Sequence, residues 1–138
     1  MSAIDNHLER TRARLHRLEP HEALAAVSRG AILVDIRPQE LRHTTGAIPD
    51  AVVIERNVLE WRLDPTSPHR IPQIEDADQA VIIFCQEGYA SSLAAASLQD
   101  IGLRNATDLV GGFRDWAAGG LRVERPELLR HAKTTDGE

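Results

Sequence analysis

The sequence predicts an α/β fold: a single domain built on a parallel sheet with helices on both faces. Strand-like and helix-like segments alternate along the chain, which is typical of parallel strands joined by right-handed helical crossovers. The strand segments are short, apolar and rich in β-branched residues, as expected of strands covered on both sides. At 138 residues the chain suits one domain with a core of useful size.

The N-terminal part of the chain carries two helical patterns. Apolar residues at roughly helical spacing predict a surface helix over residues 3–18. Pro20 opens a second helix, His21 to Arg29, which Gly30 can end in a left-handed conformation. The arginines of the first helix are most simply a solvated face, with docking of an acidic partner as the alternative.

The remaining elements follow in a regular order. We expect strand 31–35, helix 39–43, strand 52–54, helix 57–63, a proline-rich loop over 64–79, strand 81–84, helix 91–101, strand 107–110 and helix 113–118. The chain therefore divides into an N-terminal helix, residues 1–19, a main domain, residues 20–125, and a C-terminal tail, residues 126–138, that we expect to be mobile.

Composition excludes several functional classes. The formal net charge of −5 argues against a dedicated nucleic-acid binder. No segment approaches the roughly 18 apolar residues of a membrane span, and no signal peptide is evident, so we expect a cytoplasmic protein without a membrane partner. One cysteine fits a reducing compartment. The six histidines lack metal-ligand spacing, and we predict neither a metal site nor a cofactor.

That single cysteine, Cys85, stands where the strand 81–84 gives way to a glycine-containing turn and then a helix. A thiol at this point lies beside helix-terminal N–H groups that favour its anion, and serines are available to cap the helix. The candidate active-site loop comprises Cys85 and the residues that would form a backbone anion nest, Gln86, Glu87, Gly88, Tyr89, Ala90 and Ser91. The competing interpretation is a small buried hydrophobe.

The ends of two other predicted strands are followed by residues that could reach the same pocket. Asp35 and Arg37 come at the end of the strand 31–35, and Gly111 follows the strand 107–110. Ligands of parallel sheets bind outside the carboxyl ends of the strands, so these segments and Cys85 could share one pocket. We expect Asp35 and Arg37 to form a supporting hydrogen-bonded pair rather than to act on a substrate.

Four segments together resemble a single-domain rhodanese. They are Leu33-Val34-Asp35-Ile36-Arg37, Gly46-Ala47-Ile48-Pro49-Asp50-Ala51, Cys85-Gln86-Glu87-Gly88-Tyr89 and Gly111-Gly112-Phe113-Arg114-Asp115-Trp116. The resemblance covers about residues 20–123 and implies a sulfurtransferase. Its cysteine would accept sulfane sulfur from a small donor such as thiosulfate, or from a protein persulfide, and pass it to a thiol or cyanide.

The loop departs from this family at positions that matter for the donor. Many rhodaneses have arginine where this chain has Ala90, and histidine and glycine where it has Ala47 and Asp50. Without that arginine the loop lacks a bidentate donor for an oxyanion, and Glu87 adds a like charge. We predict that thiosulfate is a poor donor. Arg62, and after it Arg56, are candidate substrate-binding residues that could compensate.

Two alternatives to a sulfurtransferase stay open. The missing arginine and altered turn would also suit a non-catalytic rhodanese-like binding or regulatory module. A cysteine-dependent phosphatase or arsenate reductase is the weaker alternative, because a phosphatase loop needs arginine where Ser91 stands. The sequence does not choose an oligomeric state.

Overall fold

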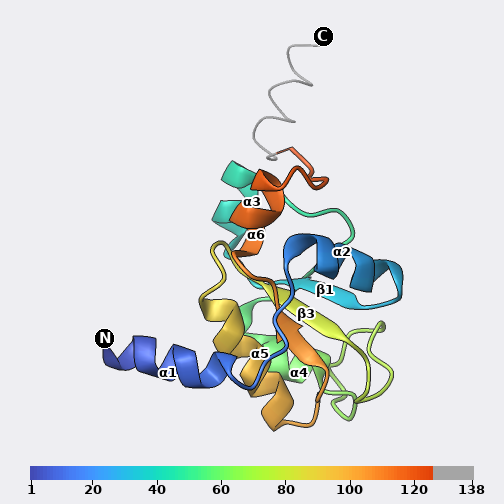
Figure 1. The fold of residues 1–138 in the computed structure, drawn as a ribbon. Coiled ribbons are helices and arrows are strands. Elements are labelled where there is room, and N and C mark those ends of the chain that lie inside the picture. The colour runs from blue at the N-terminus through green and yellow to red at the C-terminus, as the bar shows by residue number, and fades with distance from the viewer. Residues whose placement is uncertain (126–138) are drawn as a thin grey trace.

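The structure is a computed structural model that describes residues 1–125 (Figure 1). The predicted mobile tail, residues 126–138, lies outside the described residues. Four parallel strands form one sheet in the order β2-β1-β3-β4. The strands are β1 (Ile32–Asp35), β2 (Val52–Val53), β3 (Val81–Phe84) and β4 (Ala106–Asp108). The predicted parallel α/β fold is confirmed, and β3 has the predicted bounds.

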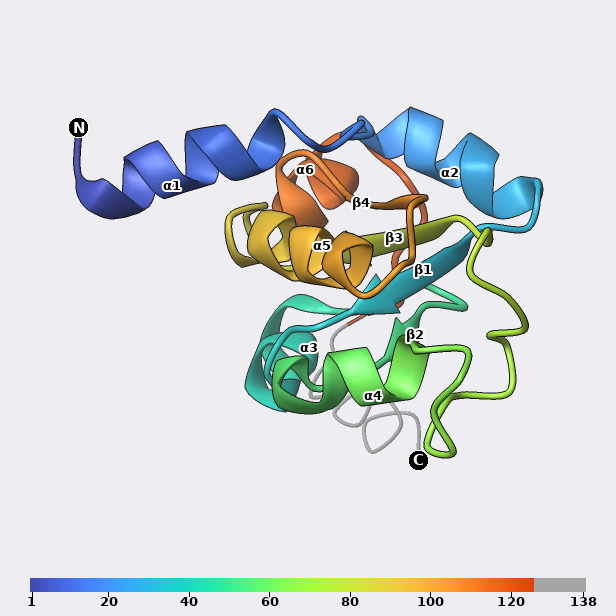
Figure 2. The ribbon, with the colours of Figure 1, turned by 90° about the horizontal axis from the view of Figure 1, so that it is seen from below.

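Helices cover both faces of the sheet (Figure 2). They are α1 (Ala3–Arg12), α2 (Pro20–Ser28), α3 (Gln39–Thr45), the 3-10 turn η1 (Arg56–Val58), α4 (Leu59–Leu63), α5 (Ala90–Asp100) and α6 (Gly112–Ala118). Helices α4 and α5 share a hydrophobic cluster with one face, and α2 and α6 share a second cluster with the other. Successive side chains of β3 point to opposite faces of the sheet. Val81 and Ile83 therefore lie in the first cluster, and Ile82 and Phe84 lie in the second.

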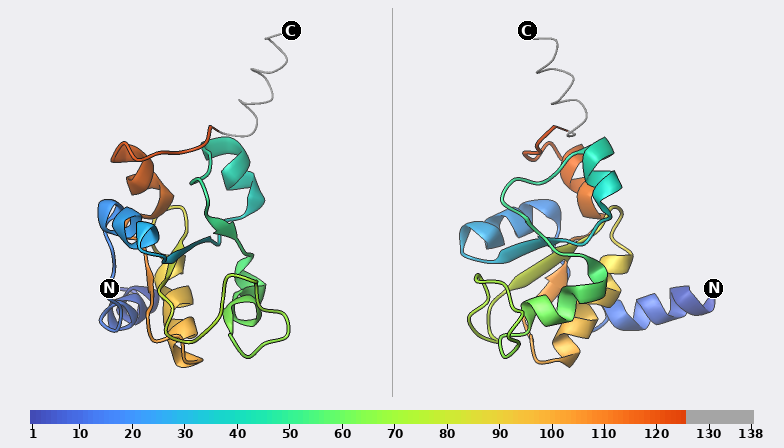
Figure 3. Two further views of the ribbon diagram at one scale, coloured as in Figure 1. Left: turned by 90° about the vertical axis from the view of Figure 1, so that its right-hand side faces the viewer. Right: turned by 180° about the vertical axis from the view of Figure 1, so that it is seen from behind.

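The first helix is shorter than predicted. Helix α1 ends at Arg12, so the predicted helix over residues 3–18 is wrong in its last part. There the chain runs beside the sheet instead: the N–H of Leu18 donates to the Asp108 carbonyl (3.1 Å), and the Leu18 carbonyl accepts from Val110 (2.9 Å). Bonds to the sheet edge replace helical bonds, and Leu15 packs on a core cluster. Helix α1 itself runs beside α5 and projects from the fold (Figure 3).

Two of the departures from the family pattern leave the fold intact. Asp50 adopts a left-handed conformation (φ 67°), which aspartate tolerates better than most residues. Ala47 exchanges backbone hydrogen bonds with Glu124, at 3.2 and 2.7 Å. Among residues 1–125, no helix is long and apolar enough to cross a membrane.

Candidate active site

A pocket of about 330 Å³ opens at the carboxyl ends of β1 and β3, with the partly exposed Cys85 in its wall. Its lining combines apolar residues with two arginines and the active-site loop. The lining residues are Ile36, Arg37, Pro38, Leu41, Arg56, Cys85, Gln86, Glu87, Tyr89 and Ala90. Because Asp35 pairs with Phe84 in the sheet register, the segments after β1 and β3 leave the sheet side by side. The predicted convergence of these two strand ends is present.

The loop folds back over the thiol. The N–H of Gly88 donates to Cys85 Sγ at 3.2 Å, so one backbone amide already faces the sulfur. Gly88 has φ +90°, and an added Cβ would lie 2.7 Å from the backbone nitrogen of Gly111. Glycine is required at this position both for its conformation and for the close approach of the two chain segments.

The start of α6 holds the first part of the loop. The N–H of Phe113 donates to the Cys85 carbonyl (2.9 Å), and the N–H of Arg114 donates to the Gln86 carbonyl (3.0 Å). Gly112 has φ +60°, and a Cβ there would overlap the Cys85 carbonyl oxygen. The glycine pair of the sequence therefore lets α6 approach the loop closely enough to bind its carbonyl groups.

Two arginines from the N-terminal segment hold the next part of the loop. Arg12 Nη2 and Arg17 Nη2 both donate to the Gly88 carbonyl, at 2.7 and 3.1 Å. Sequence reasoning missed these residues and interpreted them as a solvated face. The available indication was the high density of arginines in this segment, but the sequence did not show that two of them contact the active-site loop. Burial and, second, repulsion by Arg17 lower the pKa of Arg12 from its ordinary value.

A buried carboxylate, Asp108, organises the floor beneath the loop. Ser91 and Ser92 each donate a hydroxyl hydrogen bond to its Oδ2 at 2.8 Å, and Arg17 binds both of its oxygens, at 2.8 and 3.2 Å. The expectation that serines cap α5 is wrong, because Tyr89 occupies the cap position and no side chain caps the helix. Ser91 Oγ lies instead 3.3 Å from Cys85 Sγ, between the thiol and Asp108.

The pair Asp35 and Arg37 braces the pocket from the β1 side. Arg37 binds both carboxylate oxygens of Asp35, and both side chains are buried. The guanidinium also donates to Gln86 Oε1 (3.0 Å) and to the Gly46 carbonyl (2.9 Å), and it stacks 4.2 Å from the Phe113 ring centroid. Every side of the guanidinium is engaged, which suits support of the loop rather than capture of a substrate.

Glu87 has a cationic neighbour. Its carboxylate lies 3.6 Å from Arg114 Nη1, and both side chains are about half exposed. Repulsion of an anionic donor by Glu87 is therefore weaker than the sequence alone suggested. Ala90 is exposed and leaves the pocket without the family's loop arginine. Tyr89 is exposed at the rim, with Arg12 5.4 Å from its ring centroid.

The two candidate substrate-binding arginines differ in position. Arg56 lines the pocket and pairs with Glu60 at 3.0 Å. Arg62 is exposed, donates to the carbonyl of His69 at 2.7 Å, and is not among the residues that line the cysteine pocket. The structure thus brings Arg56 and Cys85 to one pocket and turns Arg62 to the loop that follows α4.

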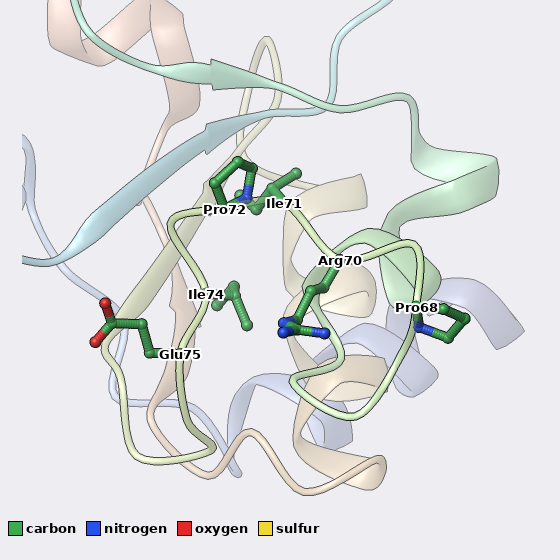
Figure 4. A pocket seen from close by; sticks show the side chains of 6 residues that line it. All are labelled: Pro68, Arg70, Ile71, Pro72, Ile74 and Glu75. Atoms are coloured by element: carbon green, nitrogen blue, oxygen red, sulfur yellow. The ribbon is translucent and has the colours of Figure 1, made fainter.

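That loop borders another hollow, shown in Figure 4. Its lining residues are Pro68, Arg70, Ile71, Pro72, Ile74 and Glu75. Arg70 is engaged within the loop through the Ser67 carbonyl (3.2 Å), and none of the lining residues is a nucleophile. No group of three or more histidine, cysteine or acidic residues with metal-binding geometry occurs in the described part of the chain. The cysteine pocket is the candidate active site.

Comparison with known proteins identifies the family of the chain. A model of the rhodanese-like domain family matches residues 19–119. The chain belongs to the rhodanese-like domain family. Among its relatives, a protein named sulfurtransferase from Allochromatium vinosum is 35% identical over 97 residues, covering 70% of this chain and 80% of the relative. Thiosulfate sulfurtransferase GlpE from Pseudomonas entomophila is 34% identical over 103 residues, covering 72% and 83%.

Solved rhodanese-like structures show the same fold. A protein of unknown function from Rhodopseudomonas palustris, described as a possible tyrosine phosphatase, superimposes with a TM-score of 0.79 and 30% identity. The match covers 90% of this rhodanese-like chain and 96% of that one. A thiosulfate sulfurtransferase from Pseudomonas aeruginosa gives a TM-score of 0.68 at 23% identity, over 86% of this chain and 22% of the other, which supports the fold alone.

Proposed function

We propose that this rhodanese-like protein is a sulfurtransferase in which Cys85 carries sulfane sulfur as a persulfide. The single observation that carries the proposal is the position of Cys85 Sγ, which lies in an open pocket and accepts the Gly88 N–H at 3.2 Å. A thiolate is the required nucleophile, and backbone N–H groups stabilise both it and the anionic outer sulfur of a persulfide. Relatives named sulfurtransferase support the same reaction class.

The reaction has two balanced steps. In the first, the Cys85 thiolate attacks the outer sulfur of a donor persulfide R–S–SH, forming Cys85–S–SH and releasing the thiolate R–S⁻. In the second, a nucleophile such as cyanide or a thiolate attacks the outer sulfur, and the Cys85 thiolate leaves. With cyanide the product is thiocyanate and one proton is released. Sulfane sulfur moves from donor to acceptor, and no external oxidant or reductant is consumed.

The pocket suits a persulfide of a small thiol or of a protein better than it suits thiosulfate as the sulfur donor. Thiosulfate carries two negative charges, and the cations lining the pocket are Arg37, which Asp35 and the loop engage, and Arg56, which Glu60 engages. Ile36, Pro38 and Leu41 give the pocket an apolar wall that suits an organic group. A single free thiol also fits a reducing, cytoplasmic setting.

The test is a comparison of sulfur loading from glutathione persulfide and from thiosulfate, followed by cyanide. We expect one added sulfur atom by mass after glutathione persulfide, its removal as thiocyanate, and much slower loading from thiosulfate. Cys85→Ser should abolish both signals. Preferred use of thiosulfate would overturn the donor assignment, and absence of an adduct with either donor would favour the non-catalytic binding module.

A phosphatase is the second candidate, because the Rhodopseudomonas palustris relative is described as a possible tyrosine phosphatase. Such an enzyme grips phosphoryl oxygens with an arginine after five intervening residues. In this chain Ser91 occupies that position and its hydroxyl binds Asp108. Hydrolysis of p-nitrophenyl phosphate that depends on Cys85 would favour the phosphatase; we expect none.

A further inference from the structure

Arg12 and Arg17 lie outside the part of the chain that the family model matches, which begins at residue 19. Both side chains nevertheless reach the active-site loop. Arg12 binds the Gly88 carbonyl and the Ser92 hydroxyl (3.1 Å), and Arg17 binds the same carbonyl and the buried Asp108. Two guanidinium groups on one carbonyl oxygen form a side-chain clamp on the loop.

The clamp orients a backbone amide. In a trans peptide the carbonyl and the following N–H point in opposite directions. Holding the Gly88 carbonyl toward the arginines therefore turns the N–H of Tyr89 away from them. The carbonyls of Cys85 and Gln86 are held in the same way by α6, which turns the next two N–H groups. With the Gly88 N–H on the sulfur, the loop keeps its carbonyls outside and its amides inside.

The clamp also supplies positive charge. Ala90 leaves the loop without its own cation, and Glu87 adds a negative charge. Arg17 is balanced by Asp108, which it binds through both oxygens. In the described part of the chain, Arg12 hydrogen-bonds to two neutral groups, the Gly88 carbonyl and the Ser92 hydroxyl, and its charge lies close enough to interact with those of Asp108 and Cys85. Arg12 is thus the cation available to offset the charge of a thiolate or persulfide.

We propose that the N-terminal segment completes the active site, with Arg12 and Arg17 as positioning residues that orient the loop amides and Arg12 also replacing the charge of the missing loop arginine. The role in sulfur transfer rests on the proposed function. The role in shaping the Cys85 environment does not rest on it, because that environment should change the rate at which the thiolate reacts with any reagent.

The experiment compares four full-length variants with the wild type. Arg12→Lys keeps the charge, whereas Arg12→Gln and Arg12→Met remove it with similar side-chain length. Arg14→Gln is the matched control, because Arg14 lies in the same segment and binds Asp100 on the surface at 2.6 Å. Two rates are measured at pH 7: alkylation of the single cysteine by iodoacetamide, and sulfur loading from glutathione persulfide. Thermal unfolding monitors the fold of each variant.

We expect both rates to fall about tenfold in Arg12→Gln and Arg12→Met, the size expected for loss of one charge-assisted hydrogen bond. The loading KM should stay unchanged, Arg12→Lys should recover most of each rate, and Arg14→Gln should match the wild type. Wild-type rates in both neutral variants, or an equal loss in Arg12→Lys, would overturn the inference. A wild type that alkylates normally but never loads sulfur would instead overturn the proposed function.

Discussion

The active-site loop is held from two sides by different kinds of group. On the α6 side, backbone N–H groups of Phe113 and Arg114 bind the carbonyls of Cys85 and Gln86. On the α1 side, the side chains of Arg12 and Arg17 bind the carbonyl of Gly88. Both arrangements have the same effect on the loop, since each holds carbonyl oxygens away from the sulfur.

The difference lies in what each contact requires of the sequence. A backbone N–H is present whatever the side chain, so the α6 contacts need only a close approach, which glycine permits. The α1 contacts need a particular side chain, and they add charge as well as a hydrogen bond. Changes on the α6 side should therefore disrupt the loop itself, whereas changes on the α1 side should tune it.

The largest effect is expected for Gly112→Ala. The new Cβ would overlap the Cys85 carbonyl oxygen and lie 2.8 Å from the carbonyl carbon of Gln86, in a backbone with φ +60°. We expect sulfur transfer to be lost and the free energy of unfolding to fall by about 3 kcal/mol. Kinetics and urea unfolding measure both. Gly120→Ala is the control, because Gly120 also has positive φ but no atom within 4 Å of its Cβ position; equal effects would refute the role of close approach.

On the α1 side, Arg17→Ala should chiefly affect stability. It leaves the fully buried Asp108 carboxylate without its cation. Removing one partner of a buried ion pair costs about 3 kcal/mol. Arg14→Ala, which breaks the exposed pair with Asp100, should cost less than about 1 kcal/mol. Chemical denaturation gives both values, and a loss for Arg17→Ala no larger than for Arg14→Ala would contradict the prediction.

Ser91→Ala tests the contacts beneath the loop independently of the contacts on its two sides. It removes the hydroxyl between Cys85 Sγ and Asp108, while Ser92 and Arg17 still bind the carboxylate. Ser91 Oγ accepts from the thiol and gives its own hydrogen to Asp108, so it has no hydrogen to offer a thiolate. Its removal should therefore speed sulfur loading, by about fivefold for a hydrogen bond worth about 1 kcal/mol, and slower loading would contradict this expectation. Rapid-quench mass measurement would give the rate. Loss of all activity would mean that Ser91 does more than hydrogen-bond.

The smallest effect is expected away from both sides, at Glu60. Burial alone would raise the pKa of Glu60, but hydrogen bonds from Ser97, its own backbone and Arg56 outweigh it, so the pKa lies below 4.5. The ionised form therefore stabilises the fold above pH 4.5, and this stabilisation is lost as the pH falls through the lowered pKa.

Glu60→Gln should accordingly lower the free energy of unfolding by less than about 1 kcal/mol at pH 7. The difference from the wild type should vanish at acidic pH, and urea unfolding from pH 7 to 3 measures it. A difference that persists at pH 3 would show that packing, not charge, is responsible.

Much of the fold follows from local sequence patterns. The run 81–84 is apolar throughout and β-branched at three of its four positions, and the structure makes it a central strand buried on both faces. The glycine in the cysteine loop and the glycine pair before α6 signalled tight turns, and the structure adds that they touch each other. The end of α1 was missed because Leu15 and Leu18 fit a helical period yet pack against the core from the segment that follows the helix.

The site was predictable only in part. Strand ends gather in a parallel sheet, so Cys85 and Asp35 could be brought together from topology alone. The contacts of Arg12 and Arg17 join residues more than 70 positions apart, and no periodicity reports such distant pairs. From the sequence we ranked Arg62 above Arg56, whereas the structure puts Arg56, and not Arg62, in the wall of the cysteine pocket.

The β-bridge between Leu18 and Leu109 has a consequence for folding order. It joins the N-terminal segment to the chain next to β4, and Arg17 reaches Asp108 across 91 positions. Contacts of such separation form late, since a long loop must close before they do. On the ribosome, the Cys85 loop lacks its floor until residue 108 has been synthesised. Its thiol therefore acquires this environment only after β4 has been synthesised.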